Sequence, residues 1–183
     1  MINIEGPLAM TEVLPEDFAG MIALRQELFI EEAVTSGVPL TNAEAHVQNW
    51  GDDISLRNLN QTWGMWLENP NDYRMRLVWR GEEMVGVYTA ERIHPEFQTA
   101  KHLMAIQLAP DIRGRGVGSM ILKDFIDWHA GLDARLEVFS GNKPAKAFYA
   151  RLGFTDTGIE KDIQIGGHST TLQMLTRKAG EVS

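Results

Sequence analysis

The residues best suited to chemistry are glycines and arginines that alternate in the middle of the chain. They lie between an apolar run typical of a strand and a run with helical periodicity, so they form a turn that ends at a helix N-terminus. Such a turn points several backbone N–H groups at one spot, and the helix dipole favours negative charge there. Glycines also let an anion approach the main chain, and arginines hydrogen-bond to phosphate oxygens. The turn therefore predicts a pyrophosphate site made of Arg113, Gly114, Arg115, Gly116, Val117, Gly118 and Ser119.

Two common phosphate-binding motifs do not fit this turn. A P-loop needs a lysine directly after its last glycine, and no lysine follows here until Lys123. The dinucleotide-binding fingerprint needs glycine or alanine where this chain has Ser119, and it opens a βαβ unit. The turn therefore indicates neither a P-loop nor a dinucleotide-binding fold.

The turn instead resembles the acyl-CoA signature of the GNAT acetyltransferases, Arg/Gln-x-x-Gly-x-Gly/Ala, which here is Arg113-x-x-Gly116-x-Gly118. The segments 136–142 and 145–154 resemble the strand, the Asn, the A-x-x-x-Y helix and the G-F terminator of the same family, in the same order and spacing. The resemblance is strong over residues 103–154. It implies one α/β (α+β) domain over residues 1–183, with a mixed central sheet of about six to seven strands flanked by about four helices.

The resemblance also implies roles for single residues. The strand that ends at Leu108 splays from the next strand, and the Leu108 amide polarises the thioester carbonyl of the acyl-CoA, as an oxyanion-hole donor does. The turn from Arg113 to Ser119 cradles the pyrophosphate. Asn142 either hydrogen-bonds the pantetheine or caps the helix that follows it. Tyr149 gives a proton to the departing CoA thiolate, or else only packs beside Phe148.

The general base stays open at this point. Some family members carry Glu or His on the strand that corresponds to residues 103–108, but this chain has neither there. His102 begins that strand, and Glu91, His94 and Glu96 precede it. A water chain to bulk solvent, or an amine that binds already neutral, needs no named base.

The resemblance implies an enzyme that moves an acetyl group from acetyl-CoA to a primary amine by direct attack in a ternary complex. The alternative is a non-catalytic module that binds or senses acyl-CoA. Acetyl-CoA is the expected co-substrate, no metal is expected, and the acceptor is a small molecule or a peptide. The identity of the amine, the length of the acyl group and the choice between monomer and homodimer are left open.

Composition bounds the class of protein. The 183 residues include no cysteine, which excludes disulfides, thiolate nucleophiles and zinc–sulfur sites. The net charge of −8 repels nucleic acid and anionic membranes at long range. No uncharged apolar run nears the roughly 20 residues that span a bilayer, and the first residues lack the basic region of a secretory signal. We expect a cytoplasmic protein that binds neither nucleic acid nor a membrane.

The same acidity predicts that the acceptor is cationic in solution. The carboxylates available on the acceptor side are Glu31, Glu32, Asp52, Asp53 and Glu91. The indoles of Trp50, Trp63 and Trp66 either line an acceptor pocket or pack in the core, and the helical spacing of the last two favours the core.

The elements that must position these residues follow from the hydrophobic periodicity. A helix begins at Pro15, and its apolar spacing is broken once, by Arg25. A capping box at Thr41 to Glu44 starts a second helical region, which Gly51 interrupts and which resumes over residues 56–67. Further helices are expected at 117–128 and 143–152, and strands at 74–79, 84–90, 103–109, 134–139, 154–165 and 169–176.

Overall fold

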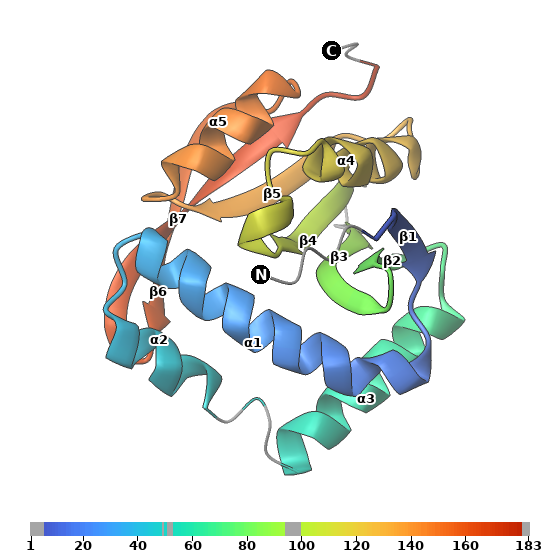
Figure 1. The fold of residues 1–183 in the computed structure, drawn as a ribbon. Helices are drawn as coiled ribbons and strands as arrows, with labels where there is room; N and C mark the ends of the chain where they lie inside the picture. The colour runs from blue at the N-terminus through green and yellow to red at the C-terminus, as the bar shows by residue number, and fades with distance from the viewer. Residues whose placement is uncertain (1–5, 49, 51–52, 94–99, 181–183) are drawn as a thin grey trace.

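Seven strands form one sheet in the order β1-β2-β3-β4-β5-β7-β6 (Figure 1). The computed structural model describes residues 6–48, 50, 53–93 and 100–180. The strands are β1 (Leu8–Glu12), β2 (Tyr73–Arg80), β3 (Glu83–Ile93), β4 (Ala100–Leu108), β5 (Ala134–Phe139), β6 (Thr155–Ile165) and β7 (His168–Arg177). The α-helices are α1 (Phe18–Thr35), α2 (Leu40–Val47), α3 (Asp53–Glu68), α4 (Val117–Asp127) and α5 (Lys143–Arg151). All strand pairs are antiparallel except β4 with β5, so the sheet is mixed, as the sequence predicts.

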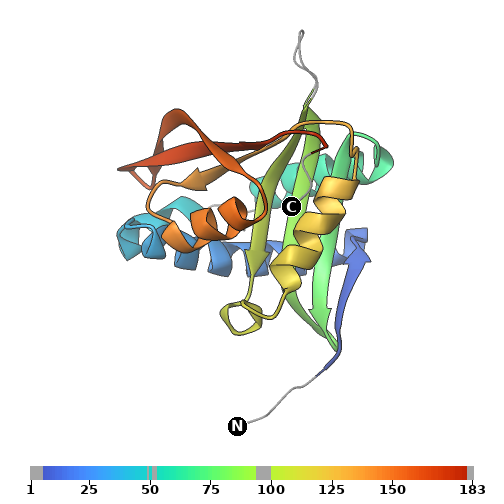
Figure 2. The same cartoon turned by 90° about the horizontal axis from the view of Figure 1, so that it is seen from above.

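Helices cover both faces of the sheet, as the view from above makes plain (Figure 2). On one face α4 and α5 pack over the sheet, and Ile121, Leu122 and Phe125 of α4 are fully buried there. On the other face α1 and α3 cover the first strands, with Met21 and Trp63 against Leu77 of β2. Helix α2 lies beside the β6–β7 hairpin, where Ala43 packs near Ile165. Periodic apolar residues on each helix therefore account for the three layers.

The parallel pair at the centre of the sheet is short. β4 and β5 are in register only from Lys101 to Leu103 and from Ala134 to Leu136. Beyond these residues β4 continues to Leu108 and β5 to Phe139, so the two strands diverge. The sheet therefore contains a wedge-shaped gap between β4 and β5, as expected from the resemblance.

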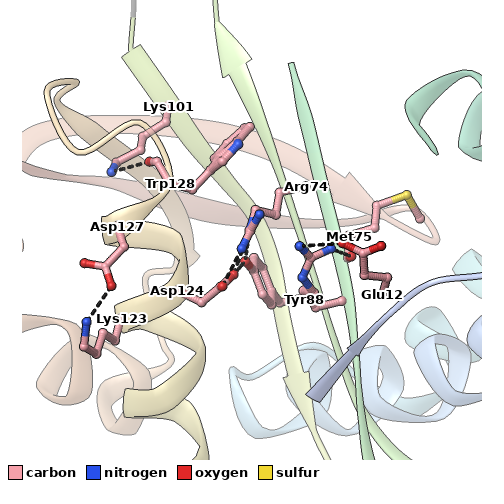
Figure 3. A network of polar contacts seen from close by, with 10 residues as sticks. Glu12, Arg74, Met75, Tyr88, Lys101, Lys123, Asp124, Asp127 and Trp128 are labelled. Carbon is pink, nitrogen blue, oxygen red and sulfur yellow. Dashed lines mark hydrogen bonds and ion pairs between the residues drawn. The ribbon is translucent and has the colours of Figure 1, made fainter. Parts of the chain in front are cut away.

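Helix α4 is fixed to the sheet by part-buried polar contacts (Figure 3). Arg74 of β2 donates to both carboxylate oxygens of Asp124, at 2.7 and 2.5 Å, and to the Tyr88 hydroxyl at 3.0 Å. The Tyr88 hydroxyl also donates to Asp124. At the other end of the helix, Lys101 of β4 donates to the backbone carbonyls of Ile126 and Trp128. These bonds hold the helix whose N-terminus faces the glycine turn.

Four details of the sequence-based assignment differ from the structure. The helical region expected to start with a capping box at Thr41 begins instead at Leu40, after Pro39, and no side chain caps it. The two parts of this region, on either side of Gly51, are the separate helices α2 and α3, so the described residues form five α-helices where about four were expected. β4 begins at Ala100 rather than at Leu103, and β1 was not predicted, because its mostly exposed side chains show no alternation of buried and exposed positions.

Candidate active site

A cavity of about 880 Å³ occupies the gap between β4 and β5. Its walls are β4 from His102 to Leu108, β5 from Leu136 to Phe139, the glycine turn, the start of α5 and one side of α1. Of the residues predicted from the sequence, the cavity is lined by Leu108, Arg113, Gly114, Gly116, Gly118, Ser119, Asn142 and Tyr149. The structure thus gathers residues from two segments of the chain around one space.

Arg115 and Val117 do not line this cavity. Arg115 is exposed to solvent. Val117, the first residue of α4, is 4% exposed and packs in the core, so any part it takes in binding is through its backbone.

The backbone of the turn requires glycine at two positions. Gly114 has a φ of 74° and Gly116 a φ of 84°, both in the left-handed region that disfavours side chains. Gly116 is the N-cap of α4, and the first hydrogen bond within that helix runs from Met120 N to Gly116 O. The amides of residues 117–119 precede it, so they are the N–H groups that a helix N-terminus offers to an anion.

Gly118 is needed for a different reason. A Cβ built at this position would lie 3.0 Å from the ring of Phe148 on α5. By contrast, a Cβ at Gly116 would meet nothing within 4 Å. Gly118 therefore lets α4 and α5 approach each other, a packing role that the sequence analysis did not assign to it.

The Arg113 guanidinium makes contacts other than the expected phosphate contact. Its Nε and Nη2 donate to the Leu108 carbonyl at 2.9 and 2.7 Å. Its Nη1 donates to Glu31 of α1 at 2.7 Å, and its Nη2 also contacts that carboxylate. The side chain therefore ties the end of β4 and the glycine turn to α1.

The Leu108 amide points into the gap between the strands. Ala109 N donates to Val85 O of β3, and successive residues of a strand direct their N–H groups to opposite edges. The Leu108 N–H and C=O therefore face away from β3, which agrees with the contact of its carbonyl with Arg113. This is the orientation that an oxyanion donor on β4 needs.

Asn142 caps α5. Its side-chain oxygen accepts from Ala145 N at 3.1 Å, and its Nδ2 donates to Glu32 of α1 at 3.2 Å. Of the two roles left open for Asn142, the cap is therefore present in the structure. Burial raises the pKa of Glu32 above its ordinary value, and the hydrogen bond from Asn142 offsets part of that effect.

Tyr149 is 9% exposed and packs between Phe148 and Phe154, with ring centroids 5.2 and 5.7 Å away. Its hydroxyl has no hydrogen-bond partner among the described residues, although the residue lines the cavity. Burial raises the pKa of Tyr149, and the nearby Glu32 carboxylate raises it further. The phenol therefore keeps its proton and can act as a donor to a group in the cavity.

His102 and Glu91 face each other across β3 and β4. The two residues are paired in register, and His102 Nδ1 lies 3.2 Å from Glu91 Oε1. Lys101 points toward the end of α4, so its neighbour His102 points to the opposite face, which α1 and α3 cover. His102 also lines the large cavity. The other two candidates, His94 and Glu96, lie outside the described residues.

A second, smaller cavity of about 340 Å³ lies between α1 and α3. It is lined by Ile22, Arg25, Trp50, Asn58, Leu59, Thr62 and Trp63, and it shares Arg25 and Trp50 with the large cavity. Trp63 is 2% exposed and meets Phe18 edge to face, so it packs in the core and at the same time forms part of the wall of this cavity. Trp66 stacks on Tyr73 with ring centroids 5.0 Å apart. Trp50 is the indole that lines both cavities.

Arg25 is the residue that sequence reasoning did not assign to a site. It is the one position that breaks the apolar spacing of α1, and in the structure it lines both cavities. The break in periodicity was a usable signal, because a charged residue on the buried face of a helix needs a specific reason to be there.

The carboxylates expected on the acceptor side mostly have partners. Glu31 pairs with Arg113, Glu32 with Asn142 and Glu91 with His102. Asp52 lies outside the described residues, and the Asp53 side chain is not described.

Comparison with known proteins places these features in a family. The sequence matches the family model described as "Acetyltransferase (GNAT) family" over residues 40–154, which is more than half of the chain. A mycothiol acetyltransferase of Corynebacterium glutamicum is 33% identical over 87 residues, which make up 46% of this chain and 29% of that protein. An N-alpha-acetyltransferase RimI of Mycobacterium tuberculosis is 30% identical over 83 residues, 44% of this chain and 51% of that protein. The chain thus matches about half or less of the length of these curated relatives.

The fold has counterparts among solved structures. The crystal structure of PaiA N-acetyltransferase from Thermoplasma acidophilum, in complex with coenzyme A, superimposes with a TM-score of 0.68 at 14% sequence identity. The superposition covers 94% of this chain and 99% of that one.

No helix in the described part of the chain combines the length and the apolar character needed to cross a bilayer. Since the matched region contains the diverging strands, the glycine turn and α5, the chain belongs to the GNAT family of acetyltransferases.

Proposed function

We propose that this protein transfers an acetyl group from acetyl-CoA to the nitrogen of an amine. The observation that carries the proposal is the gap between β4 and β5, which opens onto the N-terminus of α4 and has Tyr149 in its wall. Family membership supports a transferase, whereas the acceptors named for the relatives differ from one another. The acceptor of this chain is therefore argued from its own residues.

The residues present suit acetyl-CoA. The amides of residues 117–119 would hold the pyrophosphate, since they begin a helix and Gly116 leaves open space beside them. The extended pantetheine would lie along the free edge of β4, where the Leu108 N–H faces the gap. Bound acetyl-CoA supplies the activated acyl group, and the chain supplies position, hydrogen bonds and proton transfer.

Each residue then has a task in the transfer. The Leu108 N–H donates to the carbonyl oxygen as negative charge develops there, a kind of contact typically worth about 10²–10³ in rate. The lone pair of the amine forms the new C–N bond while the C–S bond breaks. Tyr149 Oη donates its proton to the departing sulfur and later regains one from solvent, while the attacking nitrogen gives up its proton to a separate base.

For the base we propose His102. Imidazole accepts protons near neutral pH, and Glu91 fixes the ring through Nδ1, which leaves Nε2 for the substrate. His102 lines the cavity from the face of β4 that α1 covers, whereas Glu32 is already bonded to Asn142. Glu91 acts through His102 and is a positioning residue.

The alternative is that the chain binds acyl-CoA without transferring the acyl group. The Tyr149 hydroxyl in the cavity wall has no partner in the described part of the chain, which favours the enzyme, because a purely binding module has no need of a proton donor there.

The test combines binding and turnover. Calorimetry with acetyl-CoA measures affinity, and release of the CoA thiol in the presence of a panel of amines measures transfer. We expect binding together with amine-dependent release. Binding without release above background would favour the non-catalytic module, and absence of binding would overturn both.

His102→Gln separates the base from the rest of the site. We expect unchanged affinity for acetyl-CoA and a kcat lowered by about 10²-fold at neutral pH, with the deficit shrinking as the pH rises. His168→Gln, an imidazole at the β6–β7 turn, is the matched control and should behave as wild type. Equal pH profiles for the His102 variant and wild type would mean that water or a neutral amine serves instead.

A further inference from the structure

Arg25 occupies an unusual position, since it forms part of the wall of both the large cavity and the small one. Its Nε donates to Gln107 Oε1 of β4 at 3.2 Å, and its guanidinium carbon lies 5.9 Å from the ring centroid of Trp63. Neither Nη atom has a hydrogen-bond partner among the described residues, and no described carboxylate pairs with the guanidinium. The two Nη groups therefore form a free, forked donor beside the cavities.

A cation in this setting is costly unless something compensates for it. Burial lowers the pKa of Arg25, and no neighbouring acid offsets that effect. Charged groups taken out of water are normally paired with an opposite charge. The stacking on Trp63 returns part of the lost solvation, but an indole offers no hydrogen-bond acceptor for the Nη groups. Among the described residues, the guanidinium therefore has no anionic partner.

The small cavity is suited to a small amphipathic molecule. Four of its lining residues are apolar or aromatic, namely Ile22, Leu59, Trp50 and Trp63. Two more, Asn58 and Thr62, are polar and uncharged. Arg25 is the one charged residue among the described residues that line it. Its volume of about 340 Å³ is at the lower end of the range typical of ligand pockets.

Arg25 is also on the acceptor side of the site. A bulge in the β3–β4 pairing leaves Met104 out of register, so that His102 and Gln107 emerge on the same face of β4 despite their odd separation. That face is covered by α1, which carries Arg25. The small cavity shares no residue with the glycine turn, where the cofactor phosphates would bind.

We propose that Arg25 binds an oxyanion on the acceptor, so that the acceptor carries a carboxylate or a phosphate group in addition to its amine. This inference rests on the proposed transferase function and replaces the expectation of a purely cationic acceptor. Gln107 fixes Nε, and the two Nη groups grip the oxyanion in a bidentate manner. Trp50 and Trp63 cover the apolar part of the same molecule, and the amine faces the gap between β4 and β5.

The first experiment needs only the wild-type protein. The kcat/KM for acetyl transfer is measured with matched acceptors that differ by the acid alone: L-leucine against 3-methylbutylamine, and O-phosphoethanolamine against ethanolamine. We expect a preference of at least about tenfold for the acidic member of one pair, which also distinguishes carboxylate from phosphate. A preference for the unsubstituted amine in both pairs, or no preference, overturns the inference.

The second experiment uses Arg25→Gln, with Arg57→Gln as the control, because Arg57 is an exposed cation on α3 that does not line either cavity. For Arg25→Gln we expect the kcat/KM of the acidic acceptor to fall at least about tenfold and that of its neutral partner less than about threefold. Arg25→Lys should recover only part of the loss, since an ammonium group cannot form the fork. An equal loss with both acceptors overturns the inference.

Binding measurements separate failure of this inference from failure of the proposed function. Affinity for CoA, measured by calorimetry, should be the same in wild type, Arg25→Gln and Arg57→Gln. If wild type does not bind CoA, the proposed function itself fails. If Arg25→Gln alone weakens CoA binding, the cation serves the cofactor and the inference is overturned. Quenching of Trp50 and Trp63 fluorescence by N-acetyl-L-leucine or N-acetylphosphoethanolamine gives a readout without turnover, and quenching that is unchanged in Arg25→Gln also overturns it.

Discussion

The two faces of the sheet hold their functional residues in different ways. On the face of α4 and α5, the glycine turn, Asn142 and Tyr149 follow one another within about forty residues and are set by local backbone geometry, namely two left-handed glycines and a helix cap. On the face of α1 and α3, Arg25, Gln107 and His102 come from separate elements and are fixed by side-chain contacts, one of which joins residues 82 positions apart.

This difference indicates how the two halves tolerate change. A site built from local backbone geometry depends only on neighbouring residues, so its shape is kept when other parts of the chain change. This suits the binding of an invariant cofactor. A site built from single side chains on different elements can be altered one residue at a time without disturbing the other half. We therefore expect substitutions on the α4 face to change cofactor binding or stability, and substitutions on the α1 face to change the choice of acceptor.

The largest effect should come from the anchor of α4. Asp124→Asn breaks the pair with Arg74, in which each side chain is about a fifth exposed. We expect a loss of about 3 kcal/mol in the free energy of unfolding, because the Arg74 charge is left part-buried without its partner. Asp127→Asn is the control on the same helix, since its pair with Lys123 is exposed and worth little. Urea unfolding of both variants measures the difference. Equal free energies of unfolding would mean that the Arg74–Asp124 pair does not anchor α4.

The same pair gives a pH dependence. Burial alone would raise the pKa of Asp124, but the hydrogen bonds from Arg74 and Tyr88 outweigh it and hold the pKa below its ordinary value. A lowered pKa in the folded state adds stability above the unfolded-state value of about 3.9, and that stability is lost as the pH falls through the folded-state value. As the pH falls from about 5 to about 3, the free energy of unfolding should therefore decrease more in wild type than in Asp124→Asn. Parallel curves would contradict this.

Next in size is the effect of Tyr149→Phe. The ring keeps its contacts with Phe148 and Phe154 while the proton donor is removed. We expect kcat to fall by about 10²-fold with little change in CoA affinity. Single-turnover kinetics with a true acceptor provide the measurement. If the rates match those of wild type, Tyr149 is a packing residue and water protonates the sulfur.

A smaller effect is expected for Gly116→Val. The residue has a φ of 84°, and a branched side chain in that conformation distorts the turn that holds the helix amides in place. We expect CoA affinity to fall at least about tenfold. Gly158→Val controls for backbone strain, because Gly158 has a φ of 71° and equally open surroundings but lies in β6, outside the cavity lining. Unchanged affinity in a folded Gly116→Val protein would remove the phosphate site from this turn.

The smallest effect should come from the cap of α5. Asn142→Ala removes the acceptor for Ala145 N, and we expect a loss of about 1 kcal/mol in stability. Asn142→Ser keeps a capping oxygen but lacks the second polar group with which Asn142 reaches Glu32, so it should restore most of the stability without restoring the bridge to α1. Thermal unfolding of the two variants distinguishes the cap from the bridge, and equal losses would assign the effect to the bridge.

What the sequence predicted well was local. The glycine turn, the helix that follows it, the A-x-x-x-Y helix and the last hairpin depend on neighbouring residues, and all are present where expected. What it did not predict depends on contacts between distant segments. The partner of Arg113 is Glu31, 82 positions away, and the role of Arg25 is defined by a cavity between helices that periodicity alone cannot reveal. β1 was missed because it is an exposed edge strand that pairs only with β2.

The short pairing between β4 and β5 gives the sheet two additional edges inside the molecule. A strand edge with free N–H and C=O groups is normally a liability, since it can template pairing with another chain and lead to aggregation. Here the edges face a cavity walled by α1, α5 and the glycine turn, so they do not lie at the outer edge of the sheet, where another folded chain would pair. A slender molecule with amide groups of its own can do so, in the manner of an added strand. The unpaired N–H and C=O groups of these edges are thus available to a ligand, although they lie inside the molecule.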